Sequence, residues 1–407
     1  MQNEKTLLYT QAIESFHNVS LTTREEKKLV SENYIVATHG PALTKVLCET
    51  PETLNMIGIY RVNCSHIGKE SDLVALAQYL RTIHKYVPIL IDLQWPKPRI
   101  HEMGPQGDMT VELWEMLEVT YAPGGSEEWF CTPGKLRVCF PQIVEVMQVG
   151  DVVIFDDGKM SATVREKSED RAVIECTEIL SGKETFVLGG RKWICVRNRP
   201  LGIECITEHD RKSIEFARDI LGFDFVDNIM VSYFSTPADI DNFIQIMRDE
   251  YHYTGNLWGK FETPYAVLNA EEILTKNDLT LAMLGRGDLR VEMDPRAVVN
   301  MHDIQTHFFS SCEKHGVESI CATGFLESML TPEGRVTPEE IYDMETSMTT
   351  RPDHLMLSGE STYGAQARAS IELECSYQRE TCAKIKNHVL PYHPVPVNTL
   401  KELLYIV

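Results

Sequence analysis

The sequence predicts an α/β protein: an eight-stranded parallel barrel with a small all-β domain inserted after the third strand. Short apolar runs alternate with amphipathic helical patterns, eight such runs occur, and a long β-rich stretch separates the third run from the fourth. Alternating strands and helices are typical of a parallel sheet, and eight repeats close it into a (β/α)8, or TIM, barrel. The predicted strands are Tyr34–Thr38, Ile57–Asn63, Pro88–Asp92, Phe225–Ser232, Asn256–Glu262, Leu279–Gly285, Val317–Thr323 and His354–Ser358.

Helical patterns lie between these strands, and two of them have clear start signals. Thr236 and Thr337 each precede a proline, and a threonine hydroxyl can cap a helix whose first position is proline. Glu340 follows Thr337 at the spacing of a capping box. The main predicted helices are Glu70–Tyr86, Ala238–Tyr251, Pro295–His315 and Pro338–Thr349.

The stretch from residue 104 to 199 differs from the rest in its glycine and proline punctuation and its alternating β-prone runs. Asp157-Gly158 stands between two such runs, which is a hairpin signal. We therefore expect the chain to form four parts. These are an N-terminal helical segment (1–30), the barrel (31–103 and 200–375), the inserted all-β domain (104–199) and a C-terminal tail (376–407).

The composition of the chain limits the classes of binding partner that we expect. The chain has 407 residues, a net charge of −21 and a pI of about 5.1, which argues against nonspecific binding to nucleic acid or an anionic membrane. The 11 cysteines are scattered without zinc-ligand spacing, so we expect reduced thiols and a cytoplasmic location. Neither a signal peptide nor an apolar run of membrane-spanning length is recognisable.

Chemistry in such a barrel belongs at the carboxyl ends of the strands. Lys260 and Glu262 are two residues apart at the end of the fifth predicted strand, so their side chains point the same way. Asp288 follows the sixth strand. One cation and two hard oxygen ligands suit a Mg²⁺-assisted reaction on a phosphate or an enolate.

Polar residues also follow the other predicted strands. At the second, third, fourth and seventh strands they are Arg61, Asn63, His66, Asp92, Lys97, Arg99, Ser232 and Thr323. Each alone is more typical of a solvated rim or a turn than of a catalytic group. Their recurrence at nearly every strand end is what indicates a site for phosphate and Mg²⁺.

Six motifs, in order along the chain, resemble those of the pyruvate kinase family over about residues 31 to 375. They are Tyr34-Ile-Val-Ala-Thr-His-Gly-Pro41, Tyr60-Arg-Val-Asn-Cys-Ser-His66, Gly259-Lys-Phe-Glu262, Gly285-Arg-Gly-Asp-Leu289, Cys321-Ala-Thr-Gly-Phe-Leu-Glu-Ser-Met329 and Met356-Leu-Ser-Gly-Glu-Ser361. The resemblance implies that the inserted all-β domain corresponds to the mobile lid of that family.

The resemblance also implies phosphoryl transfer between phosphoenolpyruvate and ADP, giving pyruvate and ATP with Mg²⁺ or Mn²⁺. Glu262 and Asp288 would hold the metal. Lys260 and Arg61 would bind the phosphoryl group in flight, and Thr323 would lie where the enolate takes up its proton. Phosphoryl transfer needs positioning and positive charge more than covalent chemistry, so these residue types suit the reaction.

Further roles follow from the same resemblance. The substrate-binding residues would be Ser232, Gly287, Asp288 and Thr323. The residues facing the nucleotide phosphates would be Asn63, His66, Arg99 and Lys192.

One departure from the family predicts independence of K⁺. Members that need K⁺ carry Thr-Lys-Gly-Pro-Glu after the third-strand aspartate, whereas this chain has Leu93-Gln-Trp-Pro-Lys97. Leu93 removes a hydroxyl ligand, and the ammonium of Lys97 would supply the charge that K⁺ otherwise brings. The chain thus resembles the K⁺-independent branch.

Other departures leave alternatives open. Trp95 replaces a glycine and Gly324 replaces a glutamine of the family pattern. The family's C-terminal domain is not recognisable, so we do not expect sugar-phosphate allostery; a homodimer through the barrel helices is our expectation. Two alternative hypotheses are an enzyme of the same fold acting on a different substrate or acceptor, and a non-catalytic paralogue that binds ligands or a partner.

Overall fold

The computed structural model describes residues 4–24, 26, 35–65, 67, 72–94, 97–122, 129–276, 278–387 and 397–406. Eight parallel strands close into a barrel in the order β1-β16-β15-β14-β13-β12-β3-β2. The predicted barrel fold is therefore confirmed. Its strands are β1 (Ile35–Thr38), β2 (Ile57–Asn63), β3 (Ile89–Asp92), β12 (Asn228–Val231), β13 (Asn256–Phe261), β14 (Leu279–Gly285), β15 (Glu318–Ala322) and β16 (His354–Leu357).

Apolar side chains fill the inside of the barrel below the carboxyl ends of its strands. One buried cluster takes residues from all eight strands, including Leu90, Trp258 and Met283. A second, larger cluster joins the outer faces of the strands to the surrounding helices. The barrel is thus a packed core that holds the strand ends rigidly.

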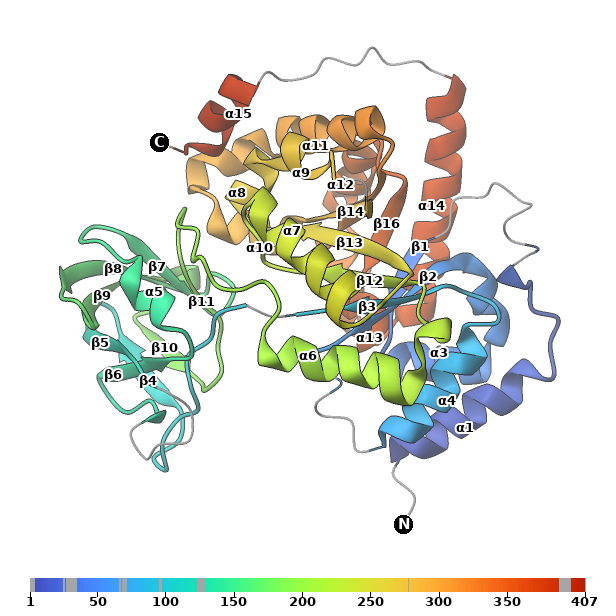
Figure 1. The fold of residues 1–407 in the computed structure, drawn as a ribbon, viewed down its shortest axis with the longest axis horizontal. Coiled ribbons are helices and arrows are strands. Elements are labelled where there is room, and N and C mark those ends of the chain that lie inside the picture. The colour runs from blue at the N-terminus through green and yellow to red at the C-terminus, as the bar shows by residue number, and fades with distance from the viewer. Residues whose placement is uncertain are drawn as a thin grey trace.

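Helices cover the outside of the barrel (Figure 1). They are α1 (Glu4–Phe16), α3 (Pro41–Glu49), α4 (Leu73–Ile83), α6 (Glu208–Glu215), α7 (Pro237–Gln245), α8 (Pro264–Leu268), α9 (Ala270–Ile273), α10 (Arg286–Glu292), α11 (Met301–His315), α12 (Pro338–Thr349), α13 (Gly359–Thr362) and α14 (Ala367–Asn387). Short turns of other helix types adjoin several of them, among them η8 (Pro295–Asn300) before α11.

Two predicted helix starts are confirmed in detail. The hydroxyls of Thr236 and Thr337 cap α7 and α12, and both caps are complete capping boxes with Asp239 and Glu340. The fourth barrel strand begins later than predicted, because a 3₁₀ turn at Phe223–Phe225 precedes β12. The apolar run there continues a helical segment before it enters the sheet.

The segment between β3 and α6 forms a separate all-β domain, called here the β domain. It contains a six-stranded sheet in the order β11-β7-β8-β9-β5-β6 and a two-stranded sheet of β10 and β4, around its own apolar core. It lies beside the barrel (Figure 1). Its elements are β4 (Met109–Glu112), β5 (Met116–Tyr121), β6 (Lys135–Val138), α5 (Pro141–Glu145), β7 (Val152–Phe155), β8 (Met160–Lys167), β9 (Arg171–Ile179), β10 (Thr185–Leu188) and β11 (Ile194–Val196).

The predicted hairpin at Asp157-Gly158 joins β7 to β8, whose end residues Phe155 and Met160 pair. After β16, α14 runs across the boundary that we expected between barrel and tail at residue 375. A last helix, α15 (Val397–Leu404), packs Leu400 and Leu404 into the barrel's outer core. Within the described ranges, no helix combines the length and apolar composition needed to cross a membrane.

Candidate active site

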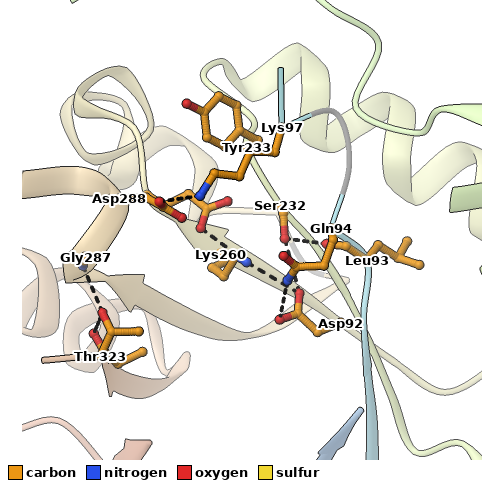
Figure 2. A network of polar contacts seen from close by, with 12 residues as sticks. Asp92, Leu93, Gln94, Lys97, Ser232, Tyr233, Lys260, Gly287, Asp288 and Thr323 are labelled. Carbon is orange, nitrogen blue, oxygen red and sulfur yellow. Dashed lines mark hydrogen bonds and ion pairs between the residues drawn. The ribbon is translucent and has the colours of Figure 1, made fainter. Parts of the chain in front are cut away.

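Six predicted residues from four strand ends line one cavity at the carboxyl end of the barrel. Its volume is about 140 Å³, and we call it the strand-end cavity. The predicted residues that line it are Arg61, Asn63, Lys260, Glu262, Asp288 and Thr323. Figure 2 shows three of these residues, Lys260, Asp288 and Thr323, at the ends of different strands.

Lys260 and Glu262 form the centre of the site. The Nζ atom of Lys260 lies 3.2 Å from Oε2 of Glu262 and 3.7 Å from Oδ1 of Asp92. Both side chains are almost fully buried. Lys260 lies in β13 and Glu262 directly follows the strand, which ends one residue earlier than predicted, and their close approach agrees with the expected common direction. Gly285 makes room for them, because a Cβ atom at this position would lie 3.1 Å from Cβ of Glu262.

The carboxyl groups of Glu262 and Asp288 influence each other across the cavity. Burial raises the pKa of Glu262 to about 8; Lys260 opposes this rise and Asp288 adds to it. Glu262 is almost fully buried and the Asp288 side chain is 25% exposed, so a cation between them would favour the ionised form of both carboxylates. Their oxygens are also the ligand type that Mg²⁺ and Mn²⁺ prefer, so the pair fits a divalent metal.

Lys97 binds one of these carboxylates. Its Nζ atom lies 2.6 Å from Oδ1 of Asp288 and 3.7 Å from Oδ1 of Asp157, in the β domain. Burial alone would lower the pKa of Lys97, but these two carboxylates outweigh it and raise the pKa. The ammonium therefore remains charged and places a fixed positive charge beside the candidate metal ligands.

Asp92 organises the floor of the site, although the sequence marked it only as a polar residue at a strand end, without a specific role. It has no exposed surface and accepts hydrogen bonds from Nε and Nη2 of Arg61 at 2.8 and 2.5 Å. The Ser232 hydroxyl donates to Asp92 at 3.2 Å and to the Leu93 carbonyl, so it faces this floor. An acid at the end of an apolar strand, β3, was the available signal.

Thr323 has a strained backbone at the end of β15. Its φ of 71° lies in the left-handed region, which is unfavourable for a β-branched residue. The Thr323 hydroxyl accepts a 2.8 Å hydrogen bond from the Gly287 amide, and Nη2 of Arg286 donates to the Thr323 carbonyl at 2.7 Å. Gly324 follows with a φ of 82°, a conformation that favours glycine over glutamine.

The β domain contacts the barrel beside Lys97. Nε1 of Trp193 donates a 3.1 Å hydrogen bond to the hydroxyl of Tyr233 in the barrel, and the Lys97 ammonium lies 4.7 Å from the centroid of the Trp193 ring. Trp193 and Tyr233 also belong to one buried apolar cluster. This contact connects the position of the β domain to the ammonium that binds Asp288.

We expect Trp193→Phe and Tyr233→Phe to weaken this contact non-additively, because each removes one partner of the same hydrogen bond. Each single change should cost about 0.5–1.5 kcal/mol, and the coupling energy should be of similar size. Hydrogen exchange of the amides in β11, measured for both single variants and the double variant, gives these values. Full additivity would show that the hydrogen bond does not hold the two parts together.

Comparison with known proteins agrees with this geometry. The sequence profile of the family described as "Pyruvate kinase, barrel domain" matches residues 30–371. The chain belongs to the pyruvate kinase family. It is 27% identical over 346 residues to a pyruvate kinase of Staphylococcus epidermidis, and 28% identical over 346 residues to one of Staphylococcus aureus. Each alignment covers 83% of this chain and 55% of the relative, so the chain spans about half the length of these relatives.

Solved pyruvate kinase structures share the fold. The enzyme of Cryptosporidium parvum superposes with a TM-score of 0.71 at 24% identity, covering 86% of this chain and 70% of the other. That of Pyrobaculum aerophilum gives a TM-score of 0.70 at 20% identity, covering 86% and 74%. These likenesses support the architecture of a pyruvate kinase barrel with an all-β insertion.

The family resemblance assigns Asn63, His66, Arg99 and Lys192 to the nucleotide phosphates. Those among them that the structure describes do not all line the strand-end cavity. Asn63 lines it and accepts a hydrogen bond from the Ser65 amide. Arg99 donates to the Arg191 carbonyl at 3.0 Å, and Lys192 binds Asp156 at 2.9 Å, so both are engaged at the β domain. His66 and Trp95 lie outside the described residues.

Proposed function

We propose that the protein transfers a phosphoryl group between phosphoenolpyruvate and ADP, giving pyruvate and ATP. The observation that carries this proposal is the convergence of two cations, Arg61 and Lys260, with two carboxylates in one cavity. In the proposed reaction the bond between phosphorus and the enolate oxygen breaks, and a bond from phosphorus to an ADP oxygen forms. Catalysis of this step rests on positioning and on compensation of charge.

Glu262 and Asp288 would hold Mg²⁺ or Mn²⁺ in this proposal. When bound, the metal would supply positive charge to substrate oxygens. Mg²⁺ usually takes only one or two protein carboxylates and completes its coordination with water and substrate oxygens. Glu262 and Asp288 would provide two carboxylates of this kind. Among the described residues, no cluster of three or more His, Cys, Asp or Glu side chains is placed to hold a metal.

The side chains around this pair would divide the remaining work. Arg61, held by Asp92 and by the Thr38 hydroxyl at 2.8 Å, would bind the phosphoryl group at a fixed orientation. Lys260 would neutralise the charge of that group during transfer. Thr323 would stand on the side from which the enolate carbon takes its proton, after the phosphoryl group has left.

The nucleotide would occupy the side of the cavity at Asn63. This residue also lines a second cavity of about 240 Å³, mostly apolar, whose wall includes His39 and Tyr9. An apolar cavity beside a phosphate-binding cavity suits a base attached to a phosphate chain. Arg99 and Lys192 would reach the phosphates after exchanging their present partners.

We expect the activity not to require K⁺. Lys97 already holds a positive charge at the site, 2.6 Å from Asp288, so an added monovalent cation brings no missing charge. Initial rates measured with tetramethylammonium as the sole monovalent cation should match those with potassium chloride. Lys97→Met should lower the rate, by roughly 10²-fold, through loss of a preorganised charge. Strict dependence of the unaltered protein on K⁺ would refute the expected independence of this cation.

The acceptor is tested by following the products. With phosphoenolpyruvate, ADP and Mg²⁺, ³¹P and ¹H NMR should show ATP and pyruvate appearing in equal amounts. Pyruvate without ATP would identify another acceptor, in agreement with the alternative of a related enzyme on a different substrate. Neither product, despite substrate binding, would favour the non-catalytic hypothesis.

A further inference from the structure

A separate cavity lies where the β domain returns to the barrel. Its volume is about 280 Å³. The segment 199–203 forms one wall, the loops after β12 and β13 form another, and Glu292 at the end of α10 contributes to the lining. None of its lining residues lines the strand-end cavity, so the two are distinct. We call it the hinge cavity.

Glu292 is an unsatisfied acid in the wall of the hinge cavity. Its side chain is 6% exposed, and its Oε1 atom has no hydrogen-bond partner among the described residues. Leaving a buried carboxylate without a donor is costly. Burial accordingly raises the pKa of Glu292 to about 8, although Lys97 acts in the opposite direction.

Two neighbouring polar groups in the cavity wall, Tyr265 and Arg199, already donate hydrogen bonds to other partners. The Tyr265 hydroxyl donates to the Asn198 carbonyl and so presents its lone pairs. Arg199 is already held by Asp151 through two hydrogen bonds. Arg199 is the cationic side chain among the residues that line the hinge cavity. Its carboxylate partner is Asp151, so it does not pair with Glu292.

We propose that the hinge cavity binds a small organic cation, with a primary ammonium group held by Glu292. A bound ammonium would favour the ionised form of Glu292 and provide the hydrogen-bond donors that this carboxylate lacks. The rings of Tyr233 and Tyr265 in the wall suit a cation with an attached apolar group. A bare metal ion fits less well, since it would need several oxygen ligands. The cavity volume of about 280 Å³ also leaves room for a small organic molecule.

Such a ligand would contact both parts of the protein at once. Cys195 and segment 199–203 belong to the β domain and its return, whereas Tyr233 and Glu292 belong to the barrel. A ligand that touches both parts favours the arrangement in which both contacts are made. Hydrogen exchange in segment 199–203 should therefore slow when the cavity is filled.

The proposal is tested with benzylammonium and its neutral counterpart of similar shape, benzyl alcohol, by titration calorimetry on the full chain. Benzylammonium should bind more tightly than benzyl alcohol. Glu292→Gln should reduce benzylammonium affinity on the order of tenfold to a hundredfold, the worth of a hydrogen bond to a charged group, and leave benzyl alcohol unchanged. Glu250→Gln, at an exposed acid paired with Arg211, is the matched control and should change neither.

Equal affinity for the two probes, or an unchanged benzylammonium affinity in Glu292→Gln, would overturn the proposal. Ile203→Trp, which enlarges a side chain in the wall, provides a second test that keeps the acid. It should weaken both probes, and unaltered benzylammonium binding in this variant would place the ligand elsewhere. These readouts do not depend on phosphoryl transfer, so they stand or fall independently of the proposed reaction.

Discussion

Lys260→Met should lower kcat for pyruvate formation by about 10²–10³-fold or more, because it removes the cation that would compensate the phosphoryl group during transfer. Methionine keeps most of the side-chain volume, so the buried site should remain filled. The KM for phosphoenolpyruvate should change much less than kcat, since the lost interaction acts mainly in the transition state. Steady-state kinetics at several substrate concentrations separate the two effects.

The control for this variant is Lys45→Met, at a lysine whose side chain is 70% exposed and lies in a surface ion pair with Glu49. It should leave kcat and KM unchanged. An equal loss in both variants would indicate a general effect of the substitution. Full activity in Lys260→Met would remove Lys260 from the proposed chemistry.

Asp92→Ala should lower the free energy of unfolding by about 3–5 kcal/mol, because it leaves buried cations without their partner. The Arg61 and Asp92 side chains are only 5% and 0% exposed, and Lys260 also lies near this acid. Urea denaturation followed by circular dichroism measures the change. Any residual activity should fall too, since Arg61 loses the group that orients it.

Asp241→Ala is the matched control for Asp92→Ala. Asp241 also pairs with a lysine, Lys276 at 2.9 Å, but its side chain is 57% exposed. A surface ion pair contributes about 0–1 kcal/mol, so this variant should be nearly neutral. A loss of less than about 1 kcal/mol in Asp92→Ala would contradict the role assigned to the buried pair.

The barrel was predictable because its signal is local and repeated. Each strand shows as an apolar run, and Thr236 and Thr337 mark helix starts through their own side chains. The onset of β12 was less predictable, because the apolar residues near Phe225 serve a 3₁₀ turn as well as the core. Hydrophobicity alone does not separate these two uses.

The candidate site also has features that the sequence predicts and others that only the fold brings together. Lys260 lies near the end of β13 and Glu262 directly follows it, so their two-residue spacing was sufficient to predict that they pair. The contact between Trp193 and Tyr233 joins residues 40 positions apart on two separate parts of the protein, and no periodicity reports it. Asp92 was visible as an acid at a strand end, but its partners come from β2 and from the segment after β12. Only the closed barrel brings those elements together.

The most direct test of the central claim is the initial rate of pyruvate formation by the purified, unaltered protein. The assay contains phosphoenolpyruvate, ADP and Mg²⁺, with omission of each in turn and with Lys260→Met as the background. The proposed function predicts a rate well above that background which is lost when ADP or the metal is omitted. A rate no higher than that of Lys260→Met under all these conditions would contradict it.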